Sequence, residues 1–516
     1  MTLPRSTRPP PGPPPFNDPA WTEQFSWVLL RQLYMLGRHH LLELGDAAWL
    51  PAHRRPPVRF LAQALVDTAA PTNFLLTNPA ALRHAWDTRG ASLARGIRNF
   101  TEDVLTRNGR PSRMPPGSFR LGTDLAATPG RVVYRNDVLE VLQYSPRTQH
   151  VHEAPLLLIP AWVNKYYIYD LAPGRSLVEW AVGQGFTVFC VSARDHSTST
   201  LDVDIETYVT HGLLVAFEVV RELCAAPRVH LVGVCSGGLF ATALAAWLEK
   251  TGKAEAATLT LLASALTLPE PADQVLSAAG MRDSEIRALA RLLARDRRCI
   301  NGRRLAMLFD LMRGESLLWE PLTSGWLRGE RPSAGDLSAW NEDTLDIPRR
   351  LFIEFLQLLA SESIARGQLR VAGETLHPGQ LTIDTFAVAA QQDHIVPWDI
   401  AYRSTLLLGG EHTFCLVPSG HMGVVVNPPR RGARYLTSRE APATSGQWRE
   451  SAAQVSGSWW QLWTDWLAER SGNRVPARPP QELPGIDNNQ APGMYVTHGW
   501  PPRFVHPPAD VPGPGL

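Results

Sequence analysis

The stretch VHLVGVCSGGLFATALAAWL, residues Val229–Leu248, decides the fold. An apolar strand pattern runs into GVCSGG, residues Gly233–Gly238, and helix-forming residues follow. The apolar run reaches the length of a membrane span, but Cys-Ser-Gly-Gly in its middle favours a strand, a tight turn and a helix. The pattern therefore predicts a sharp strand-to-helix turn with Cys235 at its tip.

The composition of this turn suits a reactive cysteine. Glycines two residues before and two residues after Cys235 let neighbouring backbone approach without a clash at Cβ. The turn also places the sulfur at the start of a helix, where the helix dipole favours a thiolate. Cys235 is the candidate nucleophile, although a buried structural cysteine is the commoner explanation of a bare GxCxG pattern. We assign that structural role to the other cysteines, Cys190, Cys224, Cys299 and Cys415.

Strand and helix patterns alternate around the turn. A hairpin about Asn136 and Asp137 comes first. Strands are predicted at 154–160, 186–192, 229–232 and 257–262, and helices at 176–183, 204–223 and 238–249. This alternation is typical of a parallel, doubly wound α/β sheet.

The whole sequence divides into four predicted regions. Residues 1–17 form a disordered Pro-rich lead-in, residues 18–129 an N-terminal helical domain, residues 130–474 an α/β catalytic domain, and residues 475–516 a Pro/Gly-rich tail. Both ends are expected to be loose. Helical patterns at about 268–375 predict a cap inserted above the sheet, before strands return at 381–390 and 413–417.

An acidic residue and a histidine follow these two late strands. Asp393 comes directly after the first, and His421 after the second. Open α/β sheets place their sites at such strand ends, and the chain order nucleophile, acid, base matches a nucleophile-elbow triad. A lone histidine near a loop is more often structural, but order and position favour His421. His394 is a second candidate, ranked as packing or support for Asp393.

Acyl transfer at Cys235 would also need donors for a developing oxyanion. One candidate is the backbone N–H of Ser236, and the other is that of Ala161 or Trp162 in the loop after an early strand. Core packing is the alternative explanation of Trp162. Together these patterns predict the α/β-hydrolase fold, with a mostly parallel sheet, a helical cap insertion and an N-terminal helical region.

The composition excludes several classes of function. Lys and Arg number 50 against 49 Asp and Glu, so there is no broad basic field for nucleic acid. Five cysteines without a CxxC pair make neither a disulfide framework nor a zinc site, which indicates a reducing compartment. The N-terminus lacks the apolar core of a secretory signal, so we expect a cytoplasmic protein. No metal-ligand spacing or nucleotide-binding glycine loop is present, and we expect no metal or organic cofactor.

Beyond these patterns, the chain resembles the polyhydroxyalkanoate synthases from about Asp18 to Val496. The segments that carry the resemblance are APTN at 70–73 with Asn78-Pro79, YRND at 134–137, WVNKYYIYDL at 162–171, the Cys235 elbow, Trp340-Asn341, DHI at 393–395 with Pro397-Trp398, Gly420-His421, NPP at 427–429 and GSWW at 457–460. The elbow and the APTN segment look more like the single-subunit synthases of medium-chain monomers.

The resemblance implies a substrate, (R)-3-hydroxyacyl-coenzyme A, and repeated acyl transfer onto a growing polyester with release of coenzyme A. It implies Cys235, Asp393 and His421 as the catalytic residues, with His394 and Asn164 as supporting residues. It also implies a homodimer at the surface of polyester granules. The stretch ARDH at 193–196 and Thr267 depart from the family pattern, which bears on the acyl channel and the cap contacts.

Two other functions fit the same residues. A Cys-dependent α/β hydrolase would cleave an ester or thioester with water as acceptor, and a synthase-like scaffold would bind granules without catalysis. The long N-terminal helical region and the Trp-rich segment Trp448–Trp466 favour the synthase. For that segment we expect core packing of a closing helix rather than polymer contact, because Trp459, Trp463 and Trp466 have helical spacing.

Overall fold

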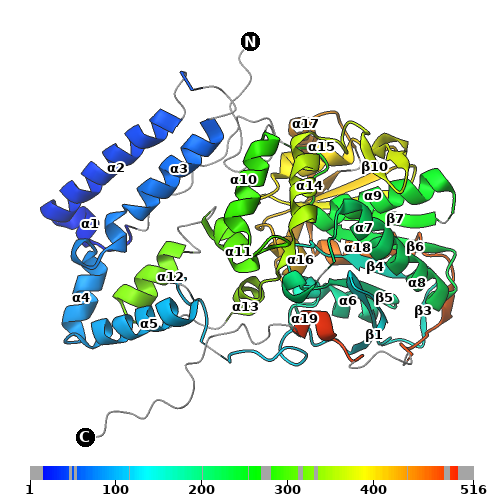
Figure 1. Cartoon of the computed structure of the whole chain (residues 1–516), viewed down its shortest axis with the longest axis horizontal. Helices are drawn as coiled ribbons and strands as arrows, with labels where there is room; N and C mark the ends of the chain where they lie inside the picture. Colours follow the sequence, from blue (N-terminus) through cyan, green and yellow to red (C-terminus); the bar gives the residue numbers. More distant parts are fainter. Residues whose placement is uncertain are drawn as a thin grey trace, which may run out of the picture.

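The described chain combines a large sheet with a separate group of N-terminal helices (Figure 1). The computed structural model describes residues 16–45, 49–50, 55–107, 109–115, 117–199, 201–253, 255–268, 281–311, 318–330, 335–438, 440–481 and 489–497. The Pro-rich lead-in falls almost entirely outside these residues.

A ten-stranded mixed sheet forms the centre of the α/β region. Its strands, in spatial order, are β1 (Gly130–Arg135), β2 (Leu139–Tyr144), β5 (Val188–Ala193), β4 (Leu156–Ile159), β6 (Arg228–Val234), β7 (Glu255–Leu262), β12 (Thr385–Ala390), β13 (His412–Val417), β14 (Arg434–Ser438) and β15 (Ala453–Ser456). Pairing is parallel from β5 to β13 and antiparallel at both edges. The predicted parallel sheet is confirmed in its central strands, whereas the β14–β15 edge was not predicted.

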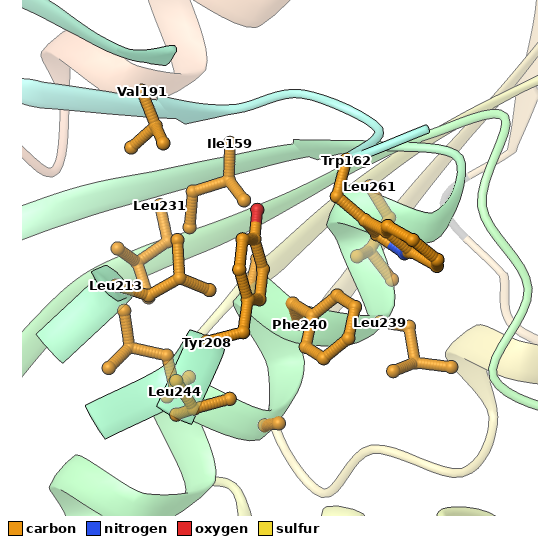
Figure 2. Close-up of a cluster of buried hydrophobic side chains, with 14 of the residues drawn as sticks. Ile159, Trp162, Val191, Tyr208, Leu213, Leu231, Leu239, Phe240, Leu244 and Leu261 are labelled. Carbon is orange, nitrogen blue, oxygen red and sulfur yellow. The ribbon is translucent and has the colours of Figure 1, made fainter. Parts of the chain in front are cut away.

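Side chains alternate between the two faces of the sheet, so both faces are buried. In β4, Leu157 and Ile159 join one hydrophobic cluster while Leu156 and Leu158 join the other. Helices α8 (Leu214–Cys224) and α9 (Ser236–Thr251) belong to the first cluster, part of which is drawn in Figure 2. The predicted helix over 204–223 is formed by α7 (Ile205–Thr207), a π-helical turn η6 (Tyr208–Leu213) and α8.

The second face is closed by α6 (Leu177–Gly183) and the Trp-rich helix α18 (Trp459–Ala468). Trp459, Trp460 and Trp463 are buried, and the Trp463 Nε1–H donates to Thr260 Oγ1 at 3.0 Å. The expectation of core packing for the Trp-rich segment is confirmed.

The N-terminal region is helical, as predicted. Its helices are α1 (Ala20–Glu23), α2 (Phe25–Gly45), α3 (Arg55–Thr68), α4 (Pro79–Asp87) and α5 (Ala91–Arg107). In Figure 1, α2 and α3 lie side by side, away from the sheet, while α5 lies next to the cap. None of the described helices is long and apolar enough to cross a membrane.

The predicted cap insertion is also helical. It contains α10 (Asp283–Leu293), α11 (Gly302–Leu311), α12 (Glu320–Leu322), α13 (Asp336–Glu342) and α14 (Arg349–Ala360). Two short strand pairs accompany them, β8 (Cys299–Ile300) with β9 (Ile347–Pro348) and β10 (Leu369–Val371) with β11 (Glu374–Leu376). Figure 1 shows α11, α12 and α13 between the N-terminal helices and the sheet. The domain boundaries near residues 129 and 474 stay our proposal.

The expectation of a loose C-terminal segment is wrong for its described parts. Strand β16 (Arg474–Pro476) pairs with β3 (His150–His152), because an extended Pro-containing segment can still pair along an edge. Farther on, helix α19 (Met494–Thr497) packs against the sheet, with Val496 fully buried. The N–H groups of Met494 and Tyr495 donate to the buried carboxylate of Glu140, which anchors this helix.

The last helices complete the region around the late strands. They are α15 (Trp398–Thr405), α16 (Gly423–Val426) and α17 (Ser445–Ser451). Helix α15 follows the Asp393 loop, and α16 begins two residues after His421. Both predicted polar residues therefore lie in short turns between a buried strand and a helix.

Candidate active site

Cys235 lies on a strained turn between β6 and α9. Its backbone has φ 52° and ψ −123°, a conformation that a residue with a Cβ rarely adopts. Its N–H donates to the carbonyl of Leu262 at 2.9 Å, which holds the turn against β7. Such strained residues persist only where the surrounding structure fixes them, and they cluster at functional sites.

Two glycines allow this turn to form. A Cβ added to Gly237 would lie 2.2 Å from the carbonyl oxygen of Ile159, and one added to Gly233 would lie 2.3 Å from the Cα of Gly238. Both distances are far shorter than a van der Waals contact. The atoms that the Cβ would meet belong to the backbone, which cannot move aside as a flexible side chain could. The start of α9 is therefore pressed against the end of β4, as the glycine spacing predicts.

Asp393 and His421 meet at the ends of the adjacent strands β12 and β13. The His421 Nδ1–H donates to Asp393 Oδ2 at 2.6 Å. The other carboxylate oxygen accepts the N–H groups of Ile395 and Val396 at 2.8 and 2.9 Å. The carboxylate is thus fixed by backbone on one side and orients the imidazole on the other.

The imidazole of His421 is 3% exposed, yet its environment favours the charged form. Burial lowers its pKa, but the Asp393 carboxylate and the Cys235 sulfur outweigh burial and raise the pKa to about 10. The second ring nitrogen, Nε2, is buried and has no partner with full hydrogen-bond geometry among the described residues. The Cys235 sulfur raises the pKa of His421 both by its charge and by hydrogen bonding, so it lies close to the ring and the three predicted residues come together in one site.

The loop after β4 runs beside the elbow. Ala161 and Trp162 are both buried, and the Trp162 indole packs edge-on against Phe355 of α14 with 5.4 Å between ring centroids. Figure 2 shows the indole near Leu239 and Leu261, so the side chain belongs to the core. The backbone N–H groups of this loop stay our candidate oxyanion donors. The N–H of Ser236 begins α9, where no intrahelical acceptor exists.

The remaining predicted residues have weaker connections to the site. Asn164 donates its backbone N–H to the Ala161 carbonyl at 3.1 Å and pairs with Thr344. His394 is half-buried beside Asp393, and its supporting role stays a prediction. Burial raises the thiol pKa of the other cysteines, to about 12 for Cys224 and Cys415, to about 11 for Cys299 and well above the usual value for Cys190. These four thiols suit a structural role.

Comparison with known proteins identifies the family. The model described as the N-terminus of poly-beta-hydroxybutyrate polymerase (PhaC) matches residues 14–181, and the α/β-hydrolase fold model matches residues 154–428. A poly(3-hydroxyalkanoate) polymerase subunit PhaC of Cupriavidus necator is 35% identical, over 89% of this chain and 78% of its own length. This chain belongs to the poly(3-hydroxyalkanoate) polymerase family.

Two further members of the polymerase family support this assignment. Poly(3-hydroxyalkanoate) polymerase 1 of Ectopseudomonas oleovorans is 32% identical over 93% of this chain and 86% of its own length. The poly(3-hydroxyalkanoate) polymerase of Methylorubrum extorquens is 32% identical over 95% of this chain and 81% of its own length. The likeness therefore includes the N-terminal helices, the cap and the sheet.

The residues that we expect to depart from the polymerase pattern connect the sheet to the cap. The Asp195 carboxylate accepts the N–H of Asp346 at 3.3 Å, and the His196 N–H donates to the Asp346 carbonyl at 2.9 Å. Thr267 Oγ1–H donates to Glu362 Oε1 at 2.8 Å. These residues therefore hold cap elements above the strand ends, and none of them replaces a residue of the Cys235 site.

Among the contacts that sequence reasoning missed in this polymerase family member is the buried ion pair between Lys165 and Asp343. Lys165 Nζ lies 2.7 Å from Asp343 Oδ1, with both side chains 2% exposed. The same ammonium donates to the Val496 carbonyl at 2.7 Å. One signal was available, because Lys165 is one of three lysines in a chain whose other basic residues are all arginine. Its partners could not be found from the sequence.

Among the described residues, no group of three or more His, Cys, Asp or Glu side chains could hold a metal ion. The side chains of Cys235, His421 and Asp393 together suit proton transfer and nucleophilic attack.

Proposed function

We propose that this chain polymerises (R)-3-hydroxyacyl-coenzyme A into polyester, with release of coenzyme A through an acyl group bound to Cys235. The observation that carries the proposal is the Asp393–His421 pair beside a cysteine on a strained turn. The family supplies the substrate class, and coenzyme A is a substrate component rather than a cofactor.

The first step is acylation of Cys235. His421 Nε2 takes the thiol proton, and the sulfur attacks the thioester carbonyl carbon. The N–H of Ser236 and that of Ala161 or Trp162 stabilise the negative oxygen of the tetrahedral intermediate. The bond to the coenzyme A sulfur then breaks, the leaving thiolate takes the proton from His421, and an acyl-Cys235 thioester remains.

The second step transfers the acyl group to a hydroxyl. The hydroxyl oxygen of another 3-hydroxyacyl group attacks the acyl carbon, its proton passes to the triad, and Cys235 leaves as the thiol that receives this proton. His421 oriented by Asp393 can accept the hydroxyl proton, and direct action of the Asp393 carboxylate is the alternative. Because the intermediate is a thioester, it keeps the activation that an ester on a serine would lose.

Polymerisation requires that water does not compete with the hydroxyl. His421 and Asp393 are buried, and Cys235 is half-buried. Cap helix α14 contacts the loop after β4, because Phe355 packs against Trp162. A covered site of this kind favours transfer to a bound hydroxyl over hydrolysis.

We further propose that the polymerase works in the cytoplasm at the granule surface, with α2 as the contacting element, and that it forms a homodimer. Helix α2 exposes a stripe of large apolar side chains, Phe25, Leu29, Leu33, Leu36 and Leu44. Apolar patches of this extent on a soluble domain mark interaction sites, and the product of the proposed reaction is an apolar polyester.

The granule proposal is tested by sedimentation with polyester particles. Leu33→Gln combined with Leu36→Gln should lower the bound fraction several-fold while thiol release stays unchanged. Leu292→Gln is the control, because Leu292 is even more exposed than Leu33 and Leu36 but lies on cap helix α10. Equal binding of all three proteins would contradict the proposal.

The enzymatic proposal is tested with 3-hydroxyacyl-coenzyme A substrates of several chain lengths. Purified protein should release free thiol and form insoluble polyester, and Cys235→Ala should abolish both. Cys415→Ala should keep both activities, because that cysteine is buried in β13 away from the elbow. Thiol release with only soluble hydroxy acid would indicate the hydrolase, and no release from a folded protein would indicate the scaffold.

A further inference from the structure

Glu342 and Asp343, at the end of α13, make ion pairs in two different directions. Glu342 is paired with Arg107 of the N-terminal helix α5, and Asp343 is paired with Lys165 in the loop after β4. All four side chains are at most 9% exposed. Two consecutive residues thus connect the N-terminal helices to a loop of the candidate active site.

The Asp343 side of this connection fixes the end of the loop. Besides the 2.7 Å pair with Lys165, the second carboxylate oxygen of Asp343 accepts the Tyr167 hydroxyl at 3.0 Å. Trp340 of α13 donates its Nε1–H to the Lys165 carbonyl at 2.9 Å. Helix α13 therefore holds both the side chain and the backbone of Lys165, four residues after Ala161.

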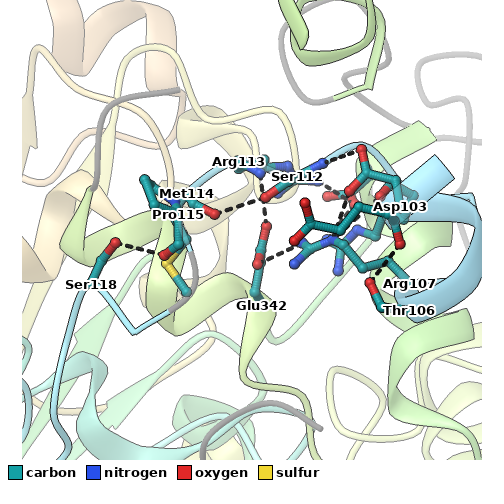
Figure 3. A network of polar contacts seen from close by, with 12 residues as sticks. Asp103, Thr106, Arg107, Ser112, Arg113, Met114, Pro115, Ser118 and Glu342 are labelled. Carbon is teal, nitrogen blue, oxygen red and sulfur yellow. Dashed lines mark hydrogen bonds and ion pairs between the residues drawn. The ribbon is translucent and has the colours of Figure 1, made fainter. Parts of the chain in front are cut away.

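The Glu342 side joins a buried polar network on α5 (Figure 3). Arg107 Nη2 lies 2.6 Å from Glu342 Oε2, and the Arg113 N–H donates to Glu342 Oε1 at 3.2 Å. Asp103 lies 3.6 Å from Arg107 and also accepts the N–H of Ser112 at 3.1 Å. The network holds α5 and the segment after it against α13.

Buried charges restrict these elements to one arrangement. An unpaired charge without water is strongly unfavourable, so each pair tolerates little displacement of its partners. An oxyanion donor is useful only when its N–H lies within hydrogen-bond distance of the developing charge, and small displacements lower the rate. A loop that supplies such a donor therefore depends on what fixes its far end.

We propose that Asp343 and Lys165 are positioning residues for the loop at 160–165, and that Glu342 couples this loop to α5. In this proposal neither ion pair acts by contact with the substrate. They act through the backbone N–H of Ala161 or Trp162, so their removal slows the attack on the thioester without changing the nucleophile. This inference rests on the proposed function only for the assignment of that loop to the oxyanion.

Two reactions of Cys235 separate positioning from a general loss of structure. Attack on 3-hydroxyacyl-coenzyme A passes through an oxyanion, whereas alkylation by iodoacetamide needs the reactive sulfur but forms no oxyanion. In Asp343→Asn and Lys165→Met, first-turnover thiol release should fall about 10- to 100-fold, with KM within about 2-fold. The alkylation rate should stay within about 2-fold of the unsubstituted protein.

Asp384→Asn is a control for the loss of an ion pair elsewhere, because Asp384 forms a 2.7 Å pair with Arg470 just before β12, at the end of that strand away from the site. It should leave both rates unchanged. An equal fall of both rates in the Asp343 and Lys165 variants, or no fall in thiol release, would overturn the proposal. Thiol release with only soluble product would refute the polymerase function and leave the positioning test intact.

Coupling through Glu342 is tested by a double variant. Glu342→Gln should slow thiol release about 3-fold to 10-fold, since it disturbs the loop indirectly. Combined with Asp343→Asn, it should not slow thiol release any further, because the loop has already lost its contact with Asp343. If the two effects multiply, Glu342 does not act through Asp343 and the coupling is refuted.

Discussion

Two loops meet at the candidate active site, and they are held in different ways. The Cys235 elbow is fixed by close backbone contacts at Gly233 and Gly237. The loop after β4 is fixed at its far end by the buried charges of Lys165 and Asp343. The difference teaches that the proposed nucleophile depends on local geometry, whereas the proposed oxyanion donor depends on residues far away in the chain.

The largest expected effect comes from filling the contact at the elbow. Gly237→Ala puts a Cβ 2.2 Å from the Ile159 carbonyl oxygen, so the turn and β4 must separate. We expect loss of thiol release and destabilisation of about 3 kcal/mol or more, measured by urea unfolding. Gly183→Ala is the control, because nothing lies within 4 Å of the added Cβ and the variant should fold normally. A fully active Gly237→Ala protein would show that the elbow does not depend on close contact between its backbone and β4.

A smaller but still large loss of activity is expected when the carboxylate that contacts His421 is changed. Asp393→Asn keeps the shape of the side chain but removes the charge that orients His421. We expect thiol release to fall about 100- to 10,000-fold, with little change in the far-ultraviolet circular dichroism spectrum. Asp399→Asn, on the first turn of α15, is a control that should keep the rate. A rate unaffected by Asp393→Asn would show that His421 is oriented by something else.

The pH dependence of stability tests the same pair. The pKa of His421 is raised from 6.5 to about 10, so its charge stabilises the folded state fully below pH 6.5 and ceases to do so as pH rises through about 10. The unfolding free energy of the protein, relative to His421→Gln, should therefore decrease between about pH 6.5 and 10. A difference that grows with pH would contradict the assigned charge.

The smallest effect is expected at Asn164, inside the second loop. Its backbone forms the contacts with Ala161 and Thr344, and its side chain forms no hydrogen bond with the described residues. Asn164→Ala should therefore change the rate of thiol release less than about 2-fold, which initial-rate measurements can resolve. A large loss would mean that the loop is positioned by Asn164 as well as by Lys165.

The elbow, the acid and the histidine could be predicted from the sequence because each depends on a short pattern. Gly233 and Gly237 lie within four residues of one another, and Asp393 and His421 each follow a buried strand directly. The order of strands then brings those two strand ends together. The meeting of Asp393 and His421 at 2.6 Å follows from that topology.

The supports of the second loop could not be predicted in this way. Lys165, Asp343 and Val496 are separated by long stretches of sequence, and no local pattern links an ammonium to one carboxylate among 49. The same reason explains the unpredicted packing of α19, whose anchor, Glu140, lies in β2. The β14–β15 edge was missed because short, half-exposed antiparallel strands carry little periodicity.

The bond between Lys165 and the Val496 carbonyl has a consequence for the newly synthesised protein. During translation the elbow, the acid and the histidine all leave the ribosome before Val496 does. Until then the ammonium lacks the carbonyl oxygen of Val496, and the loop that it holds is incompletely supported. Assembly of the candidate active site would thus finish late in biosynthesis, which would delay the proposed chemistry until most of the chain has folded.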